Sequence, residues 1–346
     1  MEQKIKELLL SVIHPETEKN IVDSGFIYNV DLNAQRVVIT LLFNKNRDPF
    51  AQKIKGQIET LIKNSYPDLS VIVTIREEKK VTETKQKSTT NNIAKIIAIA
   101  SGKGGVGKST ITANIATTLR NMGMRVGILD ADIYGPSQPK MFGVEGYLPD
   151  AEKEDGVDKI IPAMAHDIKV MSIGFFIKST DALLWRGAMA VNALKQMIHQ
   201  TKWGELDYLL IDLPPGTGDI HLSIIGELSI DGAVVVSTPQ QIAVADVIRG
   251  VEMFRNKDVN IPICGIIENM SWFTPAELPE NKYYIFGKGG AKSFSEENDI
   301  PFLGEIPIIQ SIVDGADGGQ PATTTDNLVE KYYRDIVSNI VHNIDK

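Results

Sequence analysis

The stretch that decides the fold is Ser101-Gly-Lys-Gly-Gly-Val-Gly-Lys-Ser-Thr110, a glycine-rich run between two apolar segments. Apolar residues over 93–100 predict a buried strand before it, and apolar spacing over 111–119 predicts a helix after it. Residues 102–109 fit the pattern G-x-x-x-x-G-K-[ST] without a gap. Strand, loop and helix together indicate a phosphate-binding loop. A plain glycine turn with a solvated lysine is the alternative.

The residues of this loop have the chemistry that phosphate oxygens need. The glycines allow positive φ, so that successive N–H groups can point into one concavity. Lys108 supplies a positive charge for the outer phosphates, and the Ser109 hydroxyl is suited to Mg²⁺. The helix that begins near Lys108 directs its unpaired N–H groups at the same anion. We therefore predict a nucleotide site made of Gly102, Gly104, Gly105, Val106, Gly107, Lys108, Ser109 and Thr110.

Carboxylates follow two further apolar runs. Asp130 and Asp132 come after the predicted strand 126–129, and Asp212 comes after the predicted strand 208–211. Ligands of open α/β sheets bind at the carboxyl ends of the strands. Asp212 has the Walker B arrangement, which holds Mg²⁺ through its water shell. For Asp130 and Asp132, a pair of helix-capping residues before Pro136 is the alternative.

Length, charge and cysteine content restrict the class of protein. The chain has 346 residues, enough for one large α/β domain and a small one. The net charge of −8 argues against a general nucleic-acid binder. A single cysteine, Cys264, excludes an intrachain disulfide.

Several features predict a soluble protein that stays in the cytoplasm. No stretch approaches the roughly 18 apolar residues of a membrane span. Residues 1–13 carry Glu2 and Glu7 and lack a cleavage site, so they predict an amphipathic first helix instead of a signal peptide. Residues 341–346 form no basic amphipathic anchor. We therefore expect neither a membrane nor a nucleic acid among the partners.

The apolar pattern divides the chain into three parts. Residues 1–76 have the order α-β-β-α-β, which predicts a small α+β domain. Residues 77–92 are polar and charged and predict a flexible linker, with a charged surface helix as the alternative for the first half. Strands alternate with helices over 93–346, which predicts an α/β domain with a mainly parallel sheet covered on both faces.

Further motifs make the chain resemble the Mrp/ApbC iron–sulfur cluster carriers, a branch of the MinD/ParA/Mrp ATPases with a deviant Walker A loop. The resemblance covers nearly the whole chain. Lys103, a second lysine inside the loop, carries it together with Asp-Ala-Asp-Ile-Tyr-Gly-Pro-Ser (130–137), Trp-Arg-Gly (185–187), Asp-Leu-Pro-Pro-Gly-Thr-Gly-Asp (212–219) and Glu-Asn-Met-Ser (268–271).

The front of the chain resembles the small metal–sulfur cluster assembly domain. Residues 12–16 and 21–25 carry this second resemblance. Its polar candidates are His14, Glu16 and Asp23, which we interpret as loop, cap and turn residues.

The resemblance implies a P-loop ATPase that binds ATP and Mg²⁺. Lys108 and the loop amides would hold the phosphates, and the catalytic Asp132, supported by Asp130, would position the attacking water. Ser109 and Asp212 would hold Mg²⁺. The loop 214–218, which corresponds to switch II, would sense the γ-phosphate.

The resemblance also implies a homodimer and an adenine site. Lys103 would reach across the dimer to the nucleotide of the partner subunit. Asn269 would read the adenine ring, and Pro307 would pack against it. Arg186 would contact a phosphate or the partner subunit, although an exposed arginine at the start of a helix is an equal alternative.

The family role would be the transfer of iron–sulfur clusters to apoproteins, with clients or assembly factors as partners. Many members bind the cluster with a C-x-x-C motif, where this chain has Pro275 and Leu278. Iron–sulfur clusters are usually held by thiolates. Cys264 lies in an apolar run, which predicts a buried core residue. The ligands of a cluster, and whether one is bound, therefore stay open.

Two other functions remain. The first is a nucleotide-switched dimeric scaffold of the MinD/ParA type, which would position a partner without binding a cluster. The second is a metabolic kinase, which needs an acceptor site that the sequence does not reveal.

Overall fold

The structure of the chain is a computed structural model, which describes residues 2–15, 19–22, 26–33, 36–43, 50–67, 69–77, 90, 92–154, 156–176 and 187–345. The chain divides into two compact units, Met1–Gln86 and Lys87–Lys346, and each has its own apolar core. The boundaries expected from the sequence, 1–76, 77–92 and 93–346, stay a prediction, because most of 77–92 lies outside the described residues.

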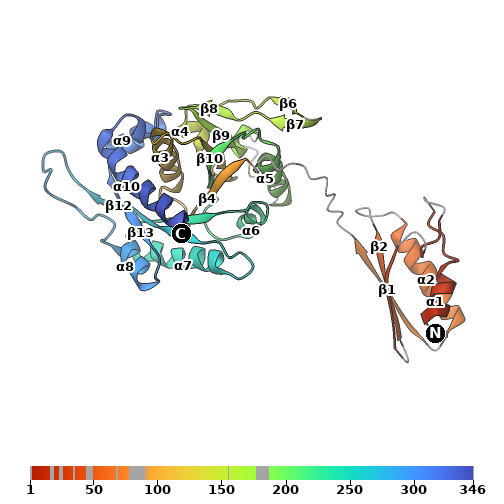
Figure 1. The fold of residues 1–346 in the computed structure, drawn as a ribbon. Coiled ribbons are helices and arrows are strands. Elements are labelled where there is room, and N and C mark those ends of the chain that lie inside the picture. Colours follow the sequence, from red (N-terminus) through yellow and green to blue (C-terminus); the bar gives the residue numbers. More distant parts are fainter. Residues whose placement is uncertain are drawn as a thin grey trace. The chain divides into compact units, whose positions relative to one another are not determined.

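The small unit is a three-stranded sheet with two helices (Figure 1). β1 (Ile27–Asn33) pairs antiparallel with β2 (Arg36–Phe43), and β2 pairs parallel with β3 (Ser70–Glu77). A parallel pair needs a crossover connection, which α2 (Ala51–Ser65) supplies. α1 (Glu2–Leu9) contacts both α2 and β1. The elements follow the order α-β-β-α-β that the apolar pattern predicts.

An eight-stranded sheet forms the centre of the large unit, in the order β13-β12-β11-β4-β10-β5-β9-β8. All neighbouring strands are parallel except β8 and β9. The predicted mainly parallel sheet is therefore confirmed. Its strands are β4 (Ile93–Ser101), β5 (Val126–Asp130), β8 (Ala163–Ala165), β9 (Ile168–Ser172), β10 (Leu206–Asp212), β11 (Gly232–Ser237), β12 (Ile263–Phe273) and β13 (Phe302–Ile308).

Helices cover both faces of this sheet (Figure 1). α3 and α10 contact each other over one face, and α7 and α8 contact each other over the other. The helices are α3 (Lys108–Asn121), α4 (Gln138–Met141), α5 (Gly187–Gln200), α6 (Asp219–Ile225), α7 (Gln241–Arg255), α8 (Gly290–Glu297), α9 (Gln310–Asp317) and α10 (Asn327–Ile344), with 3₁₀ turns at Ile173–Phe175 and Ala322–Thr324.

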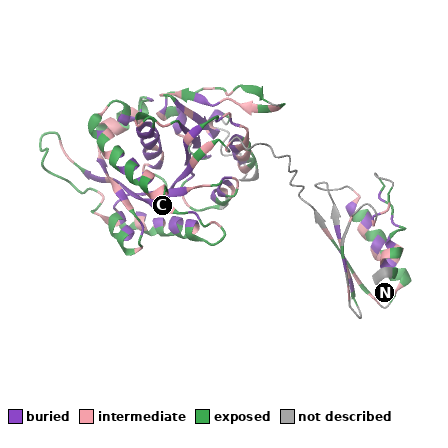
Figure 2. Ribbon diagram, in the orientation of Figure 1, coloured by how far each residue is buried: buried purple, intermediate pink, exposed green. Residues whose placement is uncertain are grey.

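Burial in the large unit is concentrated along the central strands (Figure 2). Leu210 and Ile211 of β10 and Val235 of β11 are fully buried, as a sheet covered on both faces requires. Among the described residues, no helix is long and apolar enough to cross a membrane.

The register of the parallel strands aligns polar side chains at one edge. Asp212 of β10 lies opposite Ile99 of β4 and Asp130 of β5, and Asp130 lies opposite Ser172 of β9. The carboxyl ends of four strands therefore meet where the glycine loop begins.

Two local features differ from the expectations. The strand expected over 168–176 ends at Ser172, because the Ser172 hydroxyl accepts a hydrogen bond from the N–H of Gly174 at 3.0 Å and closes a 3₁₀ turn. The hairpin of β6 (Ala151–Glu154) and β7 (Val157–Ile160) has no counterpart among the predictions. Its side chains are largely exposed, so the apolar alternation that would reveal a half-buried strand is absent.

Candidate functional site

The glycine loop connects β4 to α3, as the sequence predicts. Gly105 and Gly107 have φ of +81° and +86°, which an L side chain rarely adopts. A Cβ on Gly102 would lie 2.3 Å from the backbone of Asp246 in α7, and one on Gly107 would lie 2.3 Å from the amide nitrogen of Asn269. The loop therefore needs glycine both for its backbone shape and for its close contacts.

A buried ion pair lies at the start of α3. The Lys108 ammonium donates a hydrogen bond to Oδ1 of Asp212, and the two side chains are 6% and 0% exposed. The Lys108 Nζ also lies 3.3 Å from the Ser109 hydroxyl and 4.0 Å from the carboxylate of Asp132. A buried pair carries a large desolvation penalty, so stability alone does not account for it. The structure thus brings together four of the predicted site residues.

Asp130 shapes the segment that carries Asp132. Its carboxylate accepts hydrogen bonds from the backbone N–H groups of Asp132, Ser137 and Gln138 at 3.0–3.2 Å, and from the Ser172 hydroxyl at 3.0 Å. Burial, together with the nearby charge of Asp212, raises the pKa of Asp130 to about 7. Asp130 is fully buried and acts as an anchor for this segment.

Asp132 lies nearer the surface than Asp130 but is still buried, with 8% of its surface exposed. Burial raises its pKa, and the positive charge of Lys108 opposes this effect. A carboxylate with a raised pKa is a stronger proton acceptor, which suits a group that orients water.

Gln138 also belongs to this cluster, although the sequence did not predict it. Its side-chain amide donates hydrogen bonds to Oδ2 of Asp212 at 2.8 Å and to the carbonyl oxygen of Ser109 at 3.0 Å. Its own side-chain oxygen is buried and has no partner among the described residues. Its place in the segment 130–138, directly after the predicted carboxylates, was the only sequence signal.

The donor atoms near Lys108 fit a hard divalent cation. The Ser109 hydroxyl and the Asp212 carboxylate offer oxygen ligands, and Mg²⁺ prefers oxygen and is usually held by one or two carboxylates together with substrate phosphates. The described residues contain no cluster of three or more His, Cys, Asp or Glu side chains that could hold a metal ion alone. The two oxygen donors of Ser109 and Asp212 fit a cation whose other ligands are water and phosphate oxygens.

The structure also places the other residues that were predicted to contact the nucleotide. The Asn269 amide donates a hydrogen bond to the carbonyl oxygen of Val106 at 2.8 Å, so Asn269 braces the loop itself. Thr110 belongs to the first turn of α3, where its carbonyl oxygen accepts from Asn114. Pro307 is buried in β13, beside β12. Contacts of Asn269 and Pro307 with adenine stay predictions, as does the action of the half-buried Lys103 across a dimer.

Cys264 lies at the amino end of β12 and is 2% exposed. Burial raises the pKa of its thiol to about 11. A Cβ on Gly232 would lie 2.3 Å from its sulfur, so the neighbouring strand covers it. Pro275 and Leu278 lie in the connection after β12, where Leu278 donates a backbone hydrogen bond to Pro275 at 3.1 Å and is 48% exposed. The one thiol is thus buried, and the exposed connection contains none.

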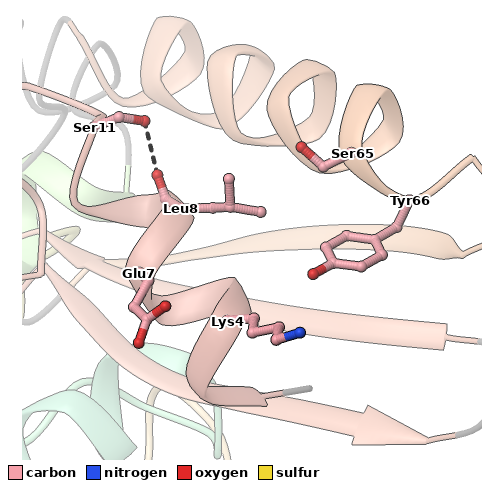
Figure 3. Close-up of a pocket in the computed structure, with 6 residues that line it drawn as sticks. All are labelled: Lys4, Glu7, Leu8, Ser11, Ser65 and Tyr66. Atoms are coloured by element: carbon pink, nitrogen blue, oxygen red, sulfur yellow. Dashed lines mark hydrogen bonds between the residues drawn. The ribbon is translucent and has the colours of Figure 1, made fainter.

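The small unit shows no comparable constellation in its described part. His14 is 1% exposed, with its ring stacked on Phe26 at 4.9 Å, as a core residue would be. Glu16 and Asp23 lie outside the described residues, as does Arg186 in the large unit. An open pocket of about 510 Å³ between α1 and α2 is lined by Lys4, Glu7, Leu8, Ser11, Ser65 and Tyr66 (Figure 3).

Two family models match the chain. Residues 92–343 match the family described as NUBPL iron-transfer P-loop NTPase. Residues 2–74 match the family described as iron-sulfur cluster assembly protein. Together the two matches span nearly the whole chain, as the resemblances noted in the sequence imply.

Named relatives and solved structures agree with these matches. An iron-sulfur cluster carrier protein of Synechocystis is 38% identical over 91% of this chain and 89% of its own length. The iron-sulfur cluster transfer protein NUBPL of Dictyostelium discoideum is 44% identical over 73% of this chain and 77% of its own. A nucleotide-binding protein from Archaeoglobus fulgidus, solved in complex with ADP, is 35% identical with a TM-score of 0.61, covering 71% of this chain and 96% of that one.

Proposed function

Since the chain belongs to the family of NUBPL iron-transfer P-loop NTPases, we propose that it is a Mg²⁺-dependent ATPase that drives the transfer of iron–sulfur clusters to apoproteins. The observation that carries the proposal is the buried pair of Lys108 and Asp212 beside the glycine loop. A lysine held in this way has its charge ready for a phosphate group that enters the loop.

Binding of ATP uses the loop and the start of α3. The N–H groups of the loop and of the first turn of α3 hold the phosphate oxygens. Lys108 moves from Asp212 to the outer phosphates, since their larger negative charge outweighs one carboxylate. Asp212, released from Lys108, and Ser109 would hold Mg²⁺, which would neutralise negative charge on the phosphates.

Hydrolysis needs a water molecule held opposite the bond to the leaving ADP. Asp132 is the carboxylate that orients this water, and its burial beside Lys108 supports the assignment. The water attacks the γ-phosphorus, the bond to the β-phosphate oxygen breaks, and ADP and phosphate leave. Lys103 stabilises the same phosphates from the partner subunit of a homodimer.

The cluster is cargo in this proposal, and the thiolates that hold it belong to partner proteins. Clusters are usually held by cysteine thiolates, and this chain has one cysteine. Cys264 is buried, with a thiol pKa of about 11. The ATP cycle therefore acts on proteins that bring or accept the cluster.

Two assays test the proposal. Purified protein should release phosphate from ATP with Mg²⁺ and lose this activity with EDTA. ATP should also accelerate cluster transfer from a thiolate-ligated donor to an apo-ferredoxin, followed by visible absorbance under anaerobic conditions. No hydrolysis with Mg²⁺ would overturn the ATPase assignment. Hydrolysis with no effect on transfer would overturn the transfer role.

The scaffold function is the second candidate, and the burial of Cys264 favours it. Anaerobic reconstitution of wild type and Cys264→Ala should leave both without a stable cluster, measured by absorbance and iron content. A stoichiometric cluster that binds to the wild type and is lost in Cys264→Ala would contradict the proposal that partner proteins hold the cluster. Hydrolysis without transfer and without a cluster would favour the scaffold.

A further inference from the structure

The loop Pro214–Pro–Gly–Thr–Gly218 follows Asp212, and both of its ends are hydrogen-bonded to one imidazole ring. His221, the third residue of α6, is 2% exposed. The N–H of Gly218 donates a hydrogen bond to its Nδ1 at 3.1 Å, and its Nε2 lies 2.8 Å from the carbonyl oxygen of Pro214. Because a carbonyl oxygen only accepts, Nε2 carries the hydrogen and Nδ1 does not. One neutral tautomer therefore joins the first and last residues of the loop.

The middle of the same loop is attached to the nucleotide loop. The N–H of Gly216, which has a φ of +87°, donates to the carbonyl oxygen of Ser101 at 3.0 Å. A Cβ on Gly104 would lie 4.0 Å from the ring of Pro215, in ordinary contact. His221 thus holds the two ends of a loop whose middle residues, Pro215 and Gly216, touch the nucleotide loop.

Capping of α6 does not explain this arrangement. A cap accounts for the bond from Gly218, which directly precedes the helix. The bond to Pro214 reaches beyond the helix to a residue two positions after Asp212. Burial lowers the pKa of His221, which keeps the imidazole in the neutral form that both bonds require.

We propose that His221 is a positioning residue for ATP hydrolysis, which holds the loop 214–218 in the shape that meets the γ-phosphate. The inference rests on the proposed ATPase function. A loop with two glycines samples many conformations when free, and an anchored loop has lost that freedom before ATP binds. ADP has no γ-phosphate, so His221 affects hydrolysis and leaves ADP binding unchanged.

Three variants test this role. His221→Ala removes both hydrogen bonds, whereas His221→Gln retains one acceptor and one donor. His199→Ala is the matched control, because His199 is half-buried on α5 and bonds to Glu227 at 2.9 Å. We expect His221→Ala to lower kcat about tenfold or more, with the Kd of ADP unchanged within about twofold. His221→Gln should recover most of kcat, and His199→Ala should match the wild type.

Hydrogen exchange of the nucleotide-free protein gives a readout that does not depend on ATPase activity. The amides of Gly216 and Gly218 should exchange faster in His221→Ala than in the wild type, and His221→Gln should restore protection. An unchanged kcat in His221→Ala, an equal loss in His221→Gln, or a parallel loss of ADP affinity would overturn the inference. A wild type that hydrolyses no ATP would refute the proposed function, whereas unchanged exchange in His221→Ala would refute the role of His221.

Discussion

The ion pair at the carboxyl ends of the parallel strands is buried, whereas the ion pairs at the amino ends are open to solvent. At the carboxyl ends, Lys108 and Asp212 form a pair whose side chains are 6% and 0% exposed. At the amino ends of β5 and β10, Arg125 bonds to Glu205 and Asp207, with side chains 54%, 75% and 30% exposed. Exposed pairs stabilise a protein little, and buried pairs carry a desolvation penalty. The difference in burial supports the proposal that the carboxyl end is organised for a ligand, whereas the pairs at the amino end lie at the surface.

The largest expected effect is that of Lys108→Ala, which removes the charge at the carboxyl end. We expect kcat for ATP hydrolysis to fall about 1,000-fold, because a preorganised charge near the phosphates is lost. Phosphate release measures the effect, with Arg125→Ala as the control from the amino end. If the kcat of Lys108→Ala stayed within about tenfold of the wild type, the difference between the buried and the exposed ion pairs would have no bearing on function.

The next effect concerns Cys264, at the amino end of β12. Its pKa of about 11 makes the thiolate about 100-fold rarer at pH 8 than in a thiol of pKa 9. Alkylation by iodoacetamide should therefore be about 100-fold slower, or slower still, than in the urea-unfolded chain, which carries the same single thiol. Mass spectrometry measures both rates. Equal rates would mean that the native strand exposes a usable thiol.

Lys103→Ala tests a second positive charge at the carboxyl ends of the strands. We expect ATP-dependent dimerisation to be lost and kcat to fall about tenfold, because a positive charge near the partner's phosphates disappears. Light scattering with ATP and with ADP measures the dimer. Lys202→Ala is the control, since Lys202 is half-buried, as Lys103 is, and pairs with Glu152 at 2.8 Å. An unchanged dimer in Lys103→Ala would refute its action across subunits.

Arg125→Ala should have the smallest effect. We expect the melting temperature to fall by no more than about 2 °C, with hydrolysis unchanged, since exposed pairs contribute little. The hydrogen bonds from Arg125 lower the pKa of Asp207. The stabilisation is therefore present above the ordinary aspartate pKa, near 4, and is lost as the pH falls through the lowered pKa. A larger difference in melting temperature at pH 3 than at pH 7 would contradict this assignment.

Sequence alone predicts the glycine loop and the carboxylates well, for a physical reason. The loop is encoded by local spacing, and Asp130 and Asp212 follow apolar strands whose carboxyl ends meet in a parallel sheet. Gln138 and the loop contacts of His221 were not predicted, because their hydrogen bonds depend on where α4 and α6 pack. The bond between Asn269 and Val106 likewise joins β12 to the glycine loop, which the sequence does not place side by side.

The close contact of Gly107 with Asn269 restricts how this chain can evolve. The amide of Asn269 occupies the place of a side chain at Gly107, where φ is already positive. Any residue larger than glycine would push the Asn269 side chain away from the nucleotide loop. A smaller residue at position 269 would remove the brace on Val106. The two positions are thus tied to each other: a side chain at 107 would displace Asn269, and the positive φ would strain it even if position 269 were made smaller.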